Sequence, residues 1–364
     1  MKIVHIAWLG AQNYGDDLMA EAVQNYLNTH FQIEKYTIWS QAHPTIHKKY
    51  TWIYPPLLGN RFKPTFFENR ALKKADLLLV GGGSVLHSSA SSLWKERGIA
   101  FFKQNTSGAA LGINVSVGPF KTTADEAACS RVLKLLDACT FRDKASFDFA
   151  CALNLPYQPE LTFDLAACYL EDQKILPREK VATIGTIGLT LREPERAGYQ
   201  EIFNNYVALL KLVSTKYPCI RLFCFSGALS KNNEFVFCQK LLNAAQIKAQ
   251  IIIYTGNAQS FTEEIKKCDF FISTRLHGLI VPYLLNIPFI SLAHKSSSDH
   301  KKFGDFNEYI QLPKDVQFEQ DNFTPSEIIQ RIVPYELPHQ TPFFELARKN
   351  FTVFKKNLYK DQRL

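Results

Sequence analysis

Short apolar segments followed at once by helix-forming sequence recur along this chain, and this alternation restricts its fold more than any other feature. Residues 3–9 form one such segment, and apolar residues at helical spacing follow within residues 18–27. Residues 270–273 form another, and an apolar run at residues 279–285 follows it. A strand that is apolar along its whole length is typical of a parallel sheet covered by helices on both faces. The alternation therefore predicts a layered α/β fold.

The alternation runs in two series, which are separated by a charged segment at residues 171–180 that contains Pro177. Such a segment is typical of a linker, and 364 residues are enough for two domains. We expect two Rossmann-like domains that face a cleft, an N-terminal one over residues 1–172 and a C-terminal one over residues 181–335. A helix at residues 342–360, apolar along one side, is expected to pack back on the first domain.

Each series supplies short strands at regular intervals. They are expected at residues 3–9, 33–39, 76–80, 114–117 and 139–143, and then at residues 184–191, 220–225, 250–254, 270–273 and 289–292. Two helix starts carry a capping-box sequence, at residues 123–126 and 260–263, and residues 324–327 are expected to start a helix with a proline in its first turn. Residues 41–69 are rich in aromatic residues and prolines without a clear period, so we expect an irregular segment there.

The composition narrows the classes of partner. The net charge of +8 favours anionic ligands such as phosphates, nucleotides or a lipid pyrophosphate. The absence of a dense basic arm or a zinc-finger pattern disfavours nucleic acid. None of the eight cysteines belongs to a Cys-x-x-Cys motif, which favours buried free thiols over disulfides or zinc ligands. The N-terminus has no secretion signal, and the apolar stretch at residues 279–293 is too short to span a bilayer, so we expect a cytoplasmic protein.

Arg275 and His277 follow the apolar strand at residues 270–273, where the chain passes into a segment with helical character. In open α/β sheets, ligands bind outside the carboxyl ends of the strands. The first N–H groups of the following helix carry a partial positive charge, so an anion is the expected ligand. The alternative is that Arg275 forms a surface ion pair and His277 caps the helix.

Two further loops follow expected strands. Gly81, Gly82, Gly83 and Ser84 come directly after an apolar strand, where glycine lets backbone N–H groups approach a phosphate or carboxylate closely, although a tight turn is an equal alternative. The sequence is not a Gly-x-Gly-x-x-Gly fingerprint, so a nicotinamide dinucleotide is disfavoured.

The other loop, residues 13–17, contains Asn13, Gly15, Asp16 and Asp17. One aspartate is explained as a helix cap. The other is then available to accept a proton from a sugar hydroxyl or to orient that hydroxyl.

Arg142 ends a strand of the first series, as Arg275 does in the second. Two arginines that approach one cleft suit a ligand with two anionic ends, because each guanidinium can hold an oxyanion with two hydrogen bonds. The alternative for Arg142 is an ion pair with Asp143 or with a glutamate. Arg192 and Lys295 also follow expected strands and are further candidates for anion binding.

Taken in order, these motifs resemble the polysaccharide pyruvyl transferase family. The motifs are Asn-x-Gly-Asp-Asp at residues 13–17, Gly-Gly-Gly-Ser at 81–84, Arg142-Asp143 with Ser146, Leu191-Arg192, and Arg275-Leu276-His277-Gly278. The resemblance implies a fold similar to that of the B-type glycosyltransferases. It also implies a phosphoenolpyruvate-dependent reaction that places a pyruvyl ketal across two hydroxyls of a hexose in a cell-surface glycan or its precursor.

The resemblance also implies roles for individual residues. The C-terminal domain would bind the donor and the N-terminal domain the acceptor. His277 would act as acid and base, with Asp16 and Asp17 as further catalytic candidates. The donor would be bound by Arg142, Arg275, Leu276, Gly278, Lys295 and Arg192, and the acceptor or phosphate loop would comprise Asn13, Gly15, Gly81, Gly82, Gly83 and Ser84. The scheme requires no metal and no cofactor besides phosphoenolpyruvate as the donor substrate.

Two other functions fit the same sequence. One is a glycosyltransferase of the same fold, whose nucleotide-sugar diphosphate would occupy the same cleft. The other is a glycan-binding or assembly protein that retains the fold without catalysis. The helix at residues 342–360 carries basic residues beside its phenylalanines, so association with the inner face of a membrane, near a lipid-linked acceptor, is an alternative to its packing on the first domain.

Overall fold

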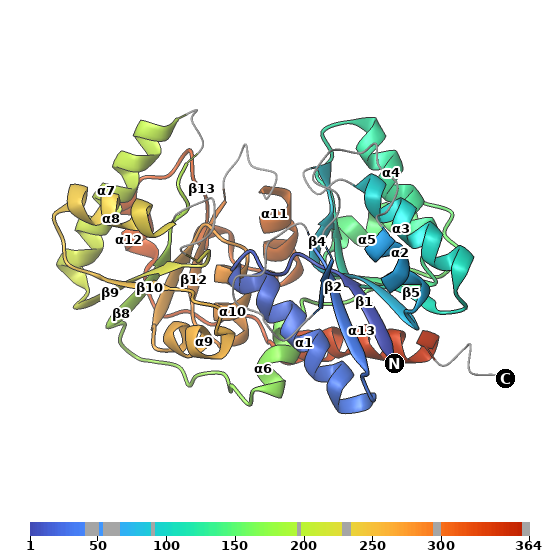
Figure 1. The fold of residues 1–364 in the computed structure, drawn as a ribbon. Helices are drawn as coiled ribbons and strands as arrows, with labels where there is room; N and C mark the ends of the chain where they lie inside the picture. Colours follow the sequence, from blue (N-terminus) through green and yellow to red (C-terminus); the bar gives the residue numbers. More distant parts are fainter. Residues whose placement is uncertain are drawn as a thin grey trace. The chain divides into compact units, whose positions relative to one another are not determined.

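The computed structural model describes residues 1–40, 51–53, 66–88, 92–194, 198–227, 234–293 and 300–358. The chain divides into two compact units (Figure 1). Unit 1 comprises Met1–Ala11, Asp16–Asp172 and Pro342–Leu364, and unit 2 comprises Gln12–Gly15 and Gln173–Thr341. The division thus places a four-residue segment near the N-terminus in unit 2.

Unit 1 is built on a seven-stranded sheet in the order β3-β2-β1-β4-β5-β6-β7, in which every pair of neighbours is parallel. The strands are β1 (Lys2–Ile6), β2 (Lys35–Trp39), β3 (Thr51–Ile53), β4 (Leu77–Leu86), β5 (Ala109–Val117), β6 (Ala138–Phe141) and β7 (Glu160–Leu161). The connecting helices are α1 (Tyr14–His30), α2 (Phe66–Lys73), α3 (Ser92–Asn105), α4 (Thr123–Leu135), α5 (Lys144–Cys151) and α6 (Ala166–Asp172).

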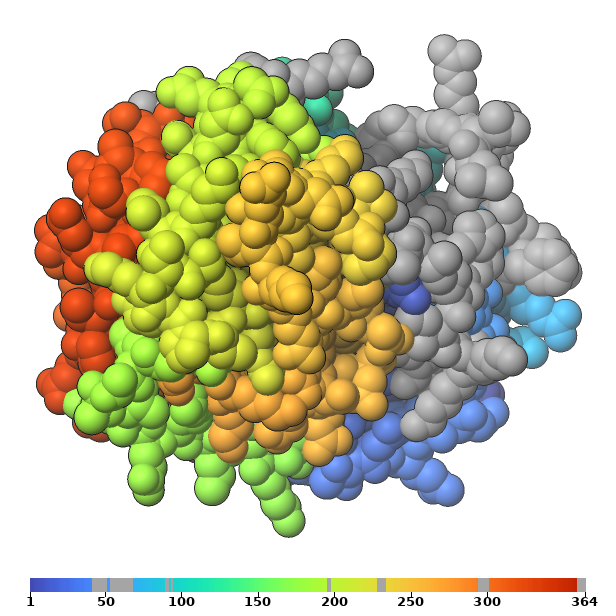
Figure 2. Space-filling model, turned by 90° about the vertical axis from the view of Figure 1, so that its left-hand side faces the viewer, coloured from blue at the N-terminus to red at the C-terminus, as the bar shows by residue number. Residues whose placement is uncertain are grey.

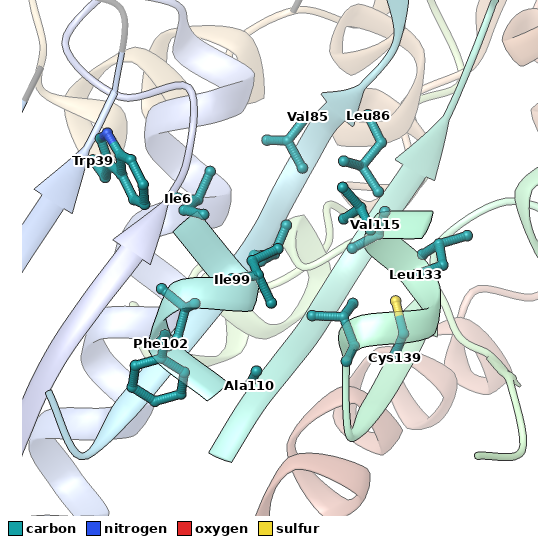
Figure 3. Packing of buried hydrophobic residues seen from close by; sticks show 14 of the residues in the cluster. Ile6, Trp39, Val85, Leu86, Ile99, Phe102, Ala110, Val115, Leu133 and Cys139 are labelled. Carbon is teal, nitrogen blue, oxygen red and sulfur yellow. The ribbon is translucent and has the colours of Figure 1, made fainter. Parts of the chain in front are cut away.

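The sheet of unit 1 is held by apolar side chains between its strands and the helices that cover it. Ile99 and Phe102 of α3 and Leu133 of α4 are fully buried against residues of β4 and β5 such as Val115 (Figure 3). Removing side chains of this size from water stabilises the fold by about 1.5 to 3 kcal/mol each. This burial explains why β4 and β5 are apolar along most of their length, as expected for strands covered on both faces.

Unit 2 repeats the architecture with a six-stranded sheet in the order β10-β9-β8-β11-β12-β13, again with parallel neighbours throughout. The strands are β8 (Thr186–Thr190), β9 (Cys219–Cys224), β10 (Gln250–Ile253), β11 (Phe270–Ser273), β12 (Phe289–Ala293) and β13 (Gln317–Glu319). The helices are α7 (Tyr199–Lys216), α8 (Glu234–Ala245), α9 (Ala258–Lys266), α10 (His277–Leu284), α11 (His300–Tyr309), the short 3-10 helix η3 (Lys314–Val316) and α12 (Pro325–Arg331). Figure 2 shows a face of this unit on which α7 and α8 lie side by side.

The last helix, α13 (Thr341–Leu358), belongs largely to unit 1. Asn350 on its buried side accepts hydrogen bonds from the hydroxyls of Thr140 and Thr162 over 2.5 and 3.0 Å, and it donates one to the carbonyl of Phe163 over 3.0 Å. Phe351 stacks on Tyr26 of α1 with 4.0 Å between the ring centroids. A buried amide whose donors and acceptors are all used fixes the position of the helix on the unit.

The predicted fold class is confirmed, because two α/β units each contain one parallel sheet. Two predicted helix caps are wrong by one or a few residues. Thr122 caps α4 by accepting the N–H of Asp125. Asn257 caps α9 by accepting the N–H of Ser260. The helix start predicted at Thr324, with a proline in its first turn, is confirmed, and the structure shows in addition that Thr324 and Glu327 form a capping box there.

Two other predictions concern membranes and cysteines. None of the helices within the described ranges is long and apolar enough to cross a bilayer. All eight cysteines are free thiols, and six of them are buried, as the sequence predicted. The expected irregular segment at residues 41–69 contains β3 and the start of α2, and the rest of it lies outside the described residues.

Candidate functional site

The strand orders locate a ligand-binding edge in each unit. The direction in which consecutive strands are added reverses between β1 and β4 in unit 1, and between β8 and β11 in unit 2. In doubly wound sheets, ligands bind outside the carboxyl ends of the strands at such a reversal. Asp16 follows β1 and Ser84 lies near the end of β4, while Arg192 and Arg275 follow β8 and β11.

Arg142 follows β6 in unit 1 and is buried, with 8% of its surface exposed. Its Nη1 donates to Asp164 Oδ2 over 3.0 Å and contacts Met19 Sδ at 3.3 Å, and its Nη2 donates to Ser84 Oγ over 3.1 Å. Asp164 is itself 2% exposed. A buried guanidinium needs a buried carboxylate of this kind, because an unpaired charge is costly inside a protein.

The partner of Arg142 is therefore Asp164, and the expected alternative of an ion pair with the adjacent Asp143 is wrong. Asp143 instead caps α5 by accepting the N–H of Ser146 over 2.8 Å. Such a cap satisfies one of the N–H groups that the first turn of a helix leaves unpaired.

The sequence predicted that the glycine segment, residues 81–84, forms a loop after a strand. In the structure this segment lies inside the strand β4. Gly81, Gly82 and Gly83 have φ angles of 139°, 67° and 130°, and Gly81 and Gly83 remain paired with β5. Only glycine adopts such angles without strain, and all three glycines are buried. A Cβ built on Gly83 would lie 3.0 Å from Asp16 Oδ1, which places the Asp16 carboxylate against this backbone.

His5 supports the same segment from β1. Its Nδ1 forms a hydrogen bond with the hydroxyl of Tyr36 over 2.7 Å, and its Nε2 lies 3.3 Å from the carbonyl oxygen of Gly81. Burial lowers the pKa of His5 to about 4, and the hydrogen bond to Gly81 opposes this shift. The imidazole is therefore neutral at neutral pH.

The start of α1 also differs from the prediction that an aspartate caps it. Asn13 precedes the helix, and its Oδ1 accepts the N–H of Gly15 over 3.3 Å. Asp16 and Asp17 both lie within the first turn, and Asp17 is buried with 1% of its surface exposed. Carboxylates in a first turn are favoured by the helix dipole without serving as its cap.

Arg275 in unit 2 has surroundings that match those of Arg142. Its Nη2 donates to Ser226 Oγ over 3.1 Å and to Glu234 Oε1, and Glu234 is 5% exposed. The backbone N–H of Arg275 donates to Ser273 Oγ over 2.9 Å, which ties the residue to the end of β11. Arg275 thus forms an ion pair, as the alternative interpretation of this residue predicted, but the pair is formed by a buried Glu234 and a partly buried Arg275 and does not lie on the surface.

His277 is the first residue of α10, and it packs against Gly15 within unit 2. A Cβ built on Gly15 would lie 1.9 Å from His277 Nδ1, a distance that no atom could occupy. The imidazole therefore lies where it does only because residue 15 has no side chain. His277 follows Leu276, which precedes the helix without a side-chain cap, so the predicted alternative that His277 caps the helix is wrong.

The segment Gln12–Gly15 is held in unit 2 by the residues that follow β9. Asn13 forms an antiparallel bridge with Ser226, and the N–H of Tyr14 donates to the carbonyl of Phe225 over 2.9 Å. The segment is thus paired with Ser226, which accepts a hydrogen bond from Arg275, and it ends at Gly15, which packs on His277.

The remaining predicted residues of unit 2 lie at the same edge. The N–H of Arg192 donates to Thr274 Oγ1 over 2.7 Å, and the N–H of Thr274 donates to the carbonyl of Thr190 over 3.0 Å. Gly278 is buried, and a Cβ built on it would lie 2.2 Å from Ser273 Oγ. These contacts join the ends of β8 and β11 and place α10 directly on them. Lys295 lies outside the described residues.

The structure thus brings the predicted residues together in two groups, one in each unit. Asp16, Gly83, Ser84 and Arg142 form the first group, and Asn13, Gly15, Arg192, Arg275, Leu276, His277 and Gly278 form the second.

Sequence reasoning missed three residues that complete these groups, namely Asp164, Ser226 and Glu234. Asp164 comes shortly after a strand and just before a helix, which is a signal that could have identified it. Ser226 and Glu234 lie after β9 and at the start of α8, in a polar stretch that carries no motif.

Within the part of the chain that the structure describes, no three His, Cys, Asp or Glu side chains lie close enough together to hold a metal ion. The groups at the two edges are guanidinium, carboxylate, hydroxyl and imidazole. This set can bind oxyanions and move protons.

The fold of the chain is similar to that of several solved enzymes. UDP-GlcNAc 2-epimerase from Methanocaldococcus jannaschii aligns with a TM-score of 0.62 at 10% sequence identity, over 98% of this chain and 100% of that one. UDP-GlcNAc 2-epimerase from Neisseria meningitidis, solved bound to UDP-GlcNAc, gives a TM-score of 0.56 at 13% identity, over 99% and 100% of the two chains. A glycosyltransferase from Rickettsia africae ESF-5 gives a TM-score of 0.54 at 12% identity, over 99% of each chain.

At identities this low, the alignments show likeness of fold alone. They confirm the predicted similarity to the B-type glycosyltransferase fold. No curated protein sequence matches the chain. The family model named polysaccharide pyruvyl transferase matches residues 13–296, which is most of the chain. The match covers the residues that the two groups share with the family pattern, from Asn13 to Gly278. The chain therefore belongs to the polysaccharide pyruvyl transferase family.

Proposed function

We propose that the protein transfers the pyruvyl group of phosphoenolpyruvate to a hexose of a cell-surface polysaccharide or its precursor, as a ketal across two hydroxyls. Membership of the pyruvyl transferase family supports the transfer reaction. The observation that carries the proposal is the placement of Arg275 and His277 where β11 passes into α10. An anionic donor is favoured there by the guanidinium and by the N–H groups of the first helical turn.

Phosphoenolpyruvate carries a phosphate and a carboxylate, and the proposed binding groups suit both. Arg142 and Arg275 bind these two anionic groups, and Arg192, Leu276 and Gly278 shape the surroundings of the donor. Guanidinium groups also stabilise the charge that develops on the phosphate as it leaves. Lys295 is a further candidate for donor binding by its place in the sequence.

The chemistry requires one proton to be delivered and two to be removed. A proton is added to the methylene carbon of the donor, and a sugar hydroxyl adds to the neighbouring carbon and loses its proton. The bond from that carbon to the phosphate oxygen then breaks, and the second hydroxyl closes the ketal and loses its proton. His277 donates in one step and accepts in another, as an imidazole can. Asp16, whose carboxylate lies against the backbone of Gly83, is the candidate to orient the sugar hydroxyls or to accept a proton from them, because Asp17 is buried with 1% of its surface exposed.

The direct test is mass spectrometry of candidate glycans after incubation with the protein and phosphoenolpyruvate. We expect a mass gain of one pyruvyl unit less water, together with release of inorganic phosphate. A thermal-shift series with phosphoenolpyruvate and nucleotide-sugars accompanies it, because a ligand that binds the native state raises its unfolding temperature. Stabilisation by nucleotide-sugars alone would replace the proposal with a glycosyltransferase.

His277→Ala is the variant that tests the proton transfer. We expect it to keep the unfolding temperature within about 2 °C of the wild type, since the change trims a side chain at the start of a helix, and to lower the transfer rate by about 10²-fold or more. Circular dichroism and the phosphate-release rate measure the two effects. Normal turnover by this variant would remove His277 from the mechanism.

A further inference from the structure

We infer that Asp164 and Glu234 are positioning residues, which hold Arg142 and Arg275 in the orientation that binds the two anionic groups of the donor. The inference rests on the proposed function. It assigns a role in that function to two carboxylates that belong to none of the motifs found in the sequence. It is based on a pair of matching environments, one in each unit.

In unit 1, the Asp164 carboxylate uses both of its oxygens. Its Oδ2 accepts from Arg142 Nη1 over 3.0 Å, and its Oδ1 accepts from the N–H of Ala166 over 2.9 Å. Ser84 Oγ accepts from the other terminal nitrogen of Arg142 over 3.1 Å. The guanidinium is therefore fixed by a carboxylate that is itself fixed to the backbone N–H of Ala166, the first residue of α6.

In unit 2, the Glu234 carboxylate has the same arrangement. Its Oε1 accepts from Arg275 Nη2, and its Oε2 accepts from the N–H of Ser226 over 3.0 Å. The hydroxyl of the same serine accepts from Arg275 over 3.1 Å. In each unit, then, one arginine meets one serine hydroxyl and one nearly buried carboxylate, whose second oxygen accepts a backbone N–H.

This arrangement requires a carboxylate and not merely a polar side chain. Each of its two oxygens accepts from a different N–H group, one from the arginine and one from the backbone. An amide of the same shape has a single acceptor oxygen, and its NH₂ group would face one of these two donors. Asp164→Asn and Glu234→Gln therefore preserve size while each must give up one of the two hydrogen bonds.

The chain offers a matched control for each variant at the amino end of the strand that the corresponding arginine follows, β6 for Arg142 and β11 for Arg275. Asp137 precedes β6, and its two oxygens accept from Lys103 Nζ and from the N–H of Ala110. Asp269 precedes β11, and its oxygens accept from Arg178 Nη2 over 2.9 Å and from the N–H of Thr186 over 2.8 Å. The bonding is of the same kind, but it lies at the amino ends of the strands, away from the ligand edge.

The experiment compares steady-state kinetics of Asp164→Asn, Glu234→Gln, Asp137→Asn and Asp269→Asn. We expect the first two to raise the KM for phosphoenolpyruvate by about tenfold or more with a smaller change in kcat, because a misdirected guanidinium loses a charge-assisted hydrogen bond to the donor. Glu234→Asp keeps both acceptor oxygens and should recover part of the loss. The two control variants should leave this KM within about twofold of the wild type.

A KM within twofold of the wild type in either Asp164→Asn or Glu234→Gln overturns the inference for that carboxylate. An equal rise in KM in the matched control overturns it as well, because the effect would then be one of general stability. The thermal unfolding temperature of all four variants separates these cases, since a role in stability alone would lower it in variant and control alike.

Crystal structures of Asp164→Asn and Glu234→Gln decide the inference independently of activity. We expect the guanidinium of Arg142 or Arg275 to move by about 1 Å or more, a displacement that is large on the scale of catalytic geometry. An unmoved guanidinium overturns the positioning role. A wild-type protein that neither binds nor consumes phosphoenolpyruvate overturns the proposed function instead, and the crystal structures still test the role of the two carboxylates.

Discussion

At the scale of single residues, close packing matters as much as charge at the ligand edge of unit 2. The imidazole of His277 fills the space that a side chain on residue 15 would need, and the built Cβ of Gly15 would come within 1.9 Å of it. The absence of a side chain at Gly15 therefore allows the proposed catalytic group, His277, to take its position. The sequence predicted Gly15 only as part of an acceptor or phosphate loop.

Gly15→Ala is expected to displace His277 and to lower kcat for pyruvyl transfer by about 10²-fold, because a shift of about 1 Å in a catalytic group has an effect of that size. The control is Gly304→Ala in α11 of the same unit, where a built Cβ meets nothing within 4 Å. That variant should keep its kcat and gain slightly in stability, since alanine favours a helix over glycine. Equal kcat values for both variants would contradict the packing argument.

His5 gives a prediction about pH. Burial lowers its pKa from 6.5 to about 4, so the unfolded chain binds a proton at this residue over a pH range in which the folded protein does not. The free energy of unfolding should therefore fall as the pH drops from 6.5 towards 4, by about 1 kcal/mol per pH unit from this residue. Urea unfolding of the wild type and of His5→Gln over this range measures the difference.

Glu21 on α1 acts in the opposite sense, which is why the comparison with His5→Gln is needed. Burial raises the pKa of Glu21 to about 7, against a hydrogen bond from Tyr169 that lowers it. The folded protein therefore holds a proton there that the unfolded chain loses, and this residue reduces stability as the pH rises from 4.5 to 7. The wild-type profile combines both effects, whereas the difference between wild type and variant isolates His5. Parallel profiles would show that His5 is not titrated as its burial requires.

At the scale of elements, most predicted helices and strands are present, and the errors lie at their ends. The predicted strand 270–273 is confirmed as β11 without change. The strand predicted at residues 76–80 is longer than expected, because the glycines after it continue to pair with β5. The predicted caps of α4 and α9 are wrong because another suitable cap residue precedes each of them, Thr122 before Thr123 and Asn257 before Ser260.

The cap of α9 tests that explanation. Asn257→Ala should lower the free energy of unfolding by about 1 kcal/mol, because the N–H of Ser260 loses its acceptor. Ser260→Ala should change it by less than about 0.5 kcal/mol, although the sequence favours this residue as the cap. Urea unfolding of both variants makes the comparison, and the reverse order of effects would restore the capping box predicted at Ser260.

At the scale of the whole molecule, the division into units does not follow the order of the sequence. Tyr14 follows the first strand of unit 1, yet it lies wholly buried in unit 2. Its hydroxyl is 2.6 Å from Thr262 Oγ1, and its ring lies 4.8 Å from Phe261 and 5.3 Å from Phe225, measured between ring centroids. A residue from the start of the chain is thus part of the core of unit 2.

Tyr14→Ala is expected to destabilise unit 2 by about 3 to 5 kcal/mol, the usual cost of removing a buried aromatic ring. Tyr14→Phe should cost only about 1 kcal/mol, since the Thr262 hydroxyl keeps a hydrogen bond to the carbonyl of Ala258. Hydrogen exchange read by mass spectrometry locates the effect. Faster exchange should appear in β9 and α9, and its appearance in β1 and β2 instead would contradict the assignment of Tyr14 to unit 2.

The sequence by itself determined the fold class, the position of most elements and the family, because apolar periodicity and ordered motifs are local properties of the chain. It also led us to propose Arg142, Arg275 and His277 as site residues, because they follow strands that can be recognised from their own residues. Only the tertiary structure revealed Asp164 and Glu234 as the partners of the arginines, Asn13 as the cap of α1, and Gly15 and Tyr14 as parts of unit 2. The arginine partners lie 22 and 41 residues away along the chain. Pairings over such distances depend on how strands are ordered in a sheet, and no local pattern of residues records that order.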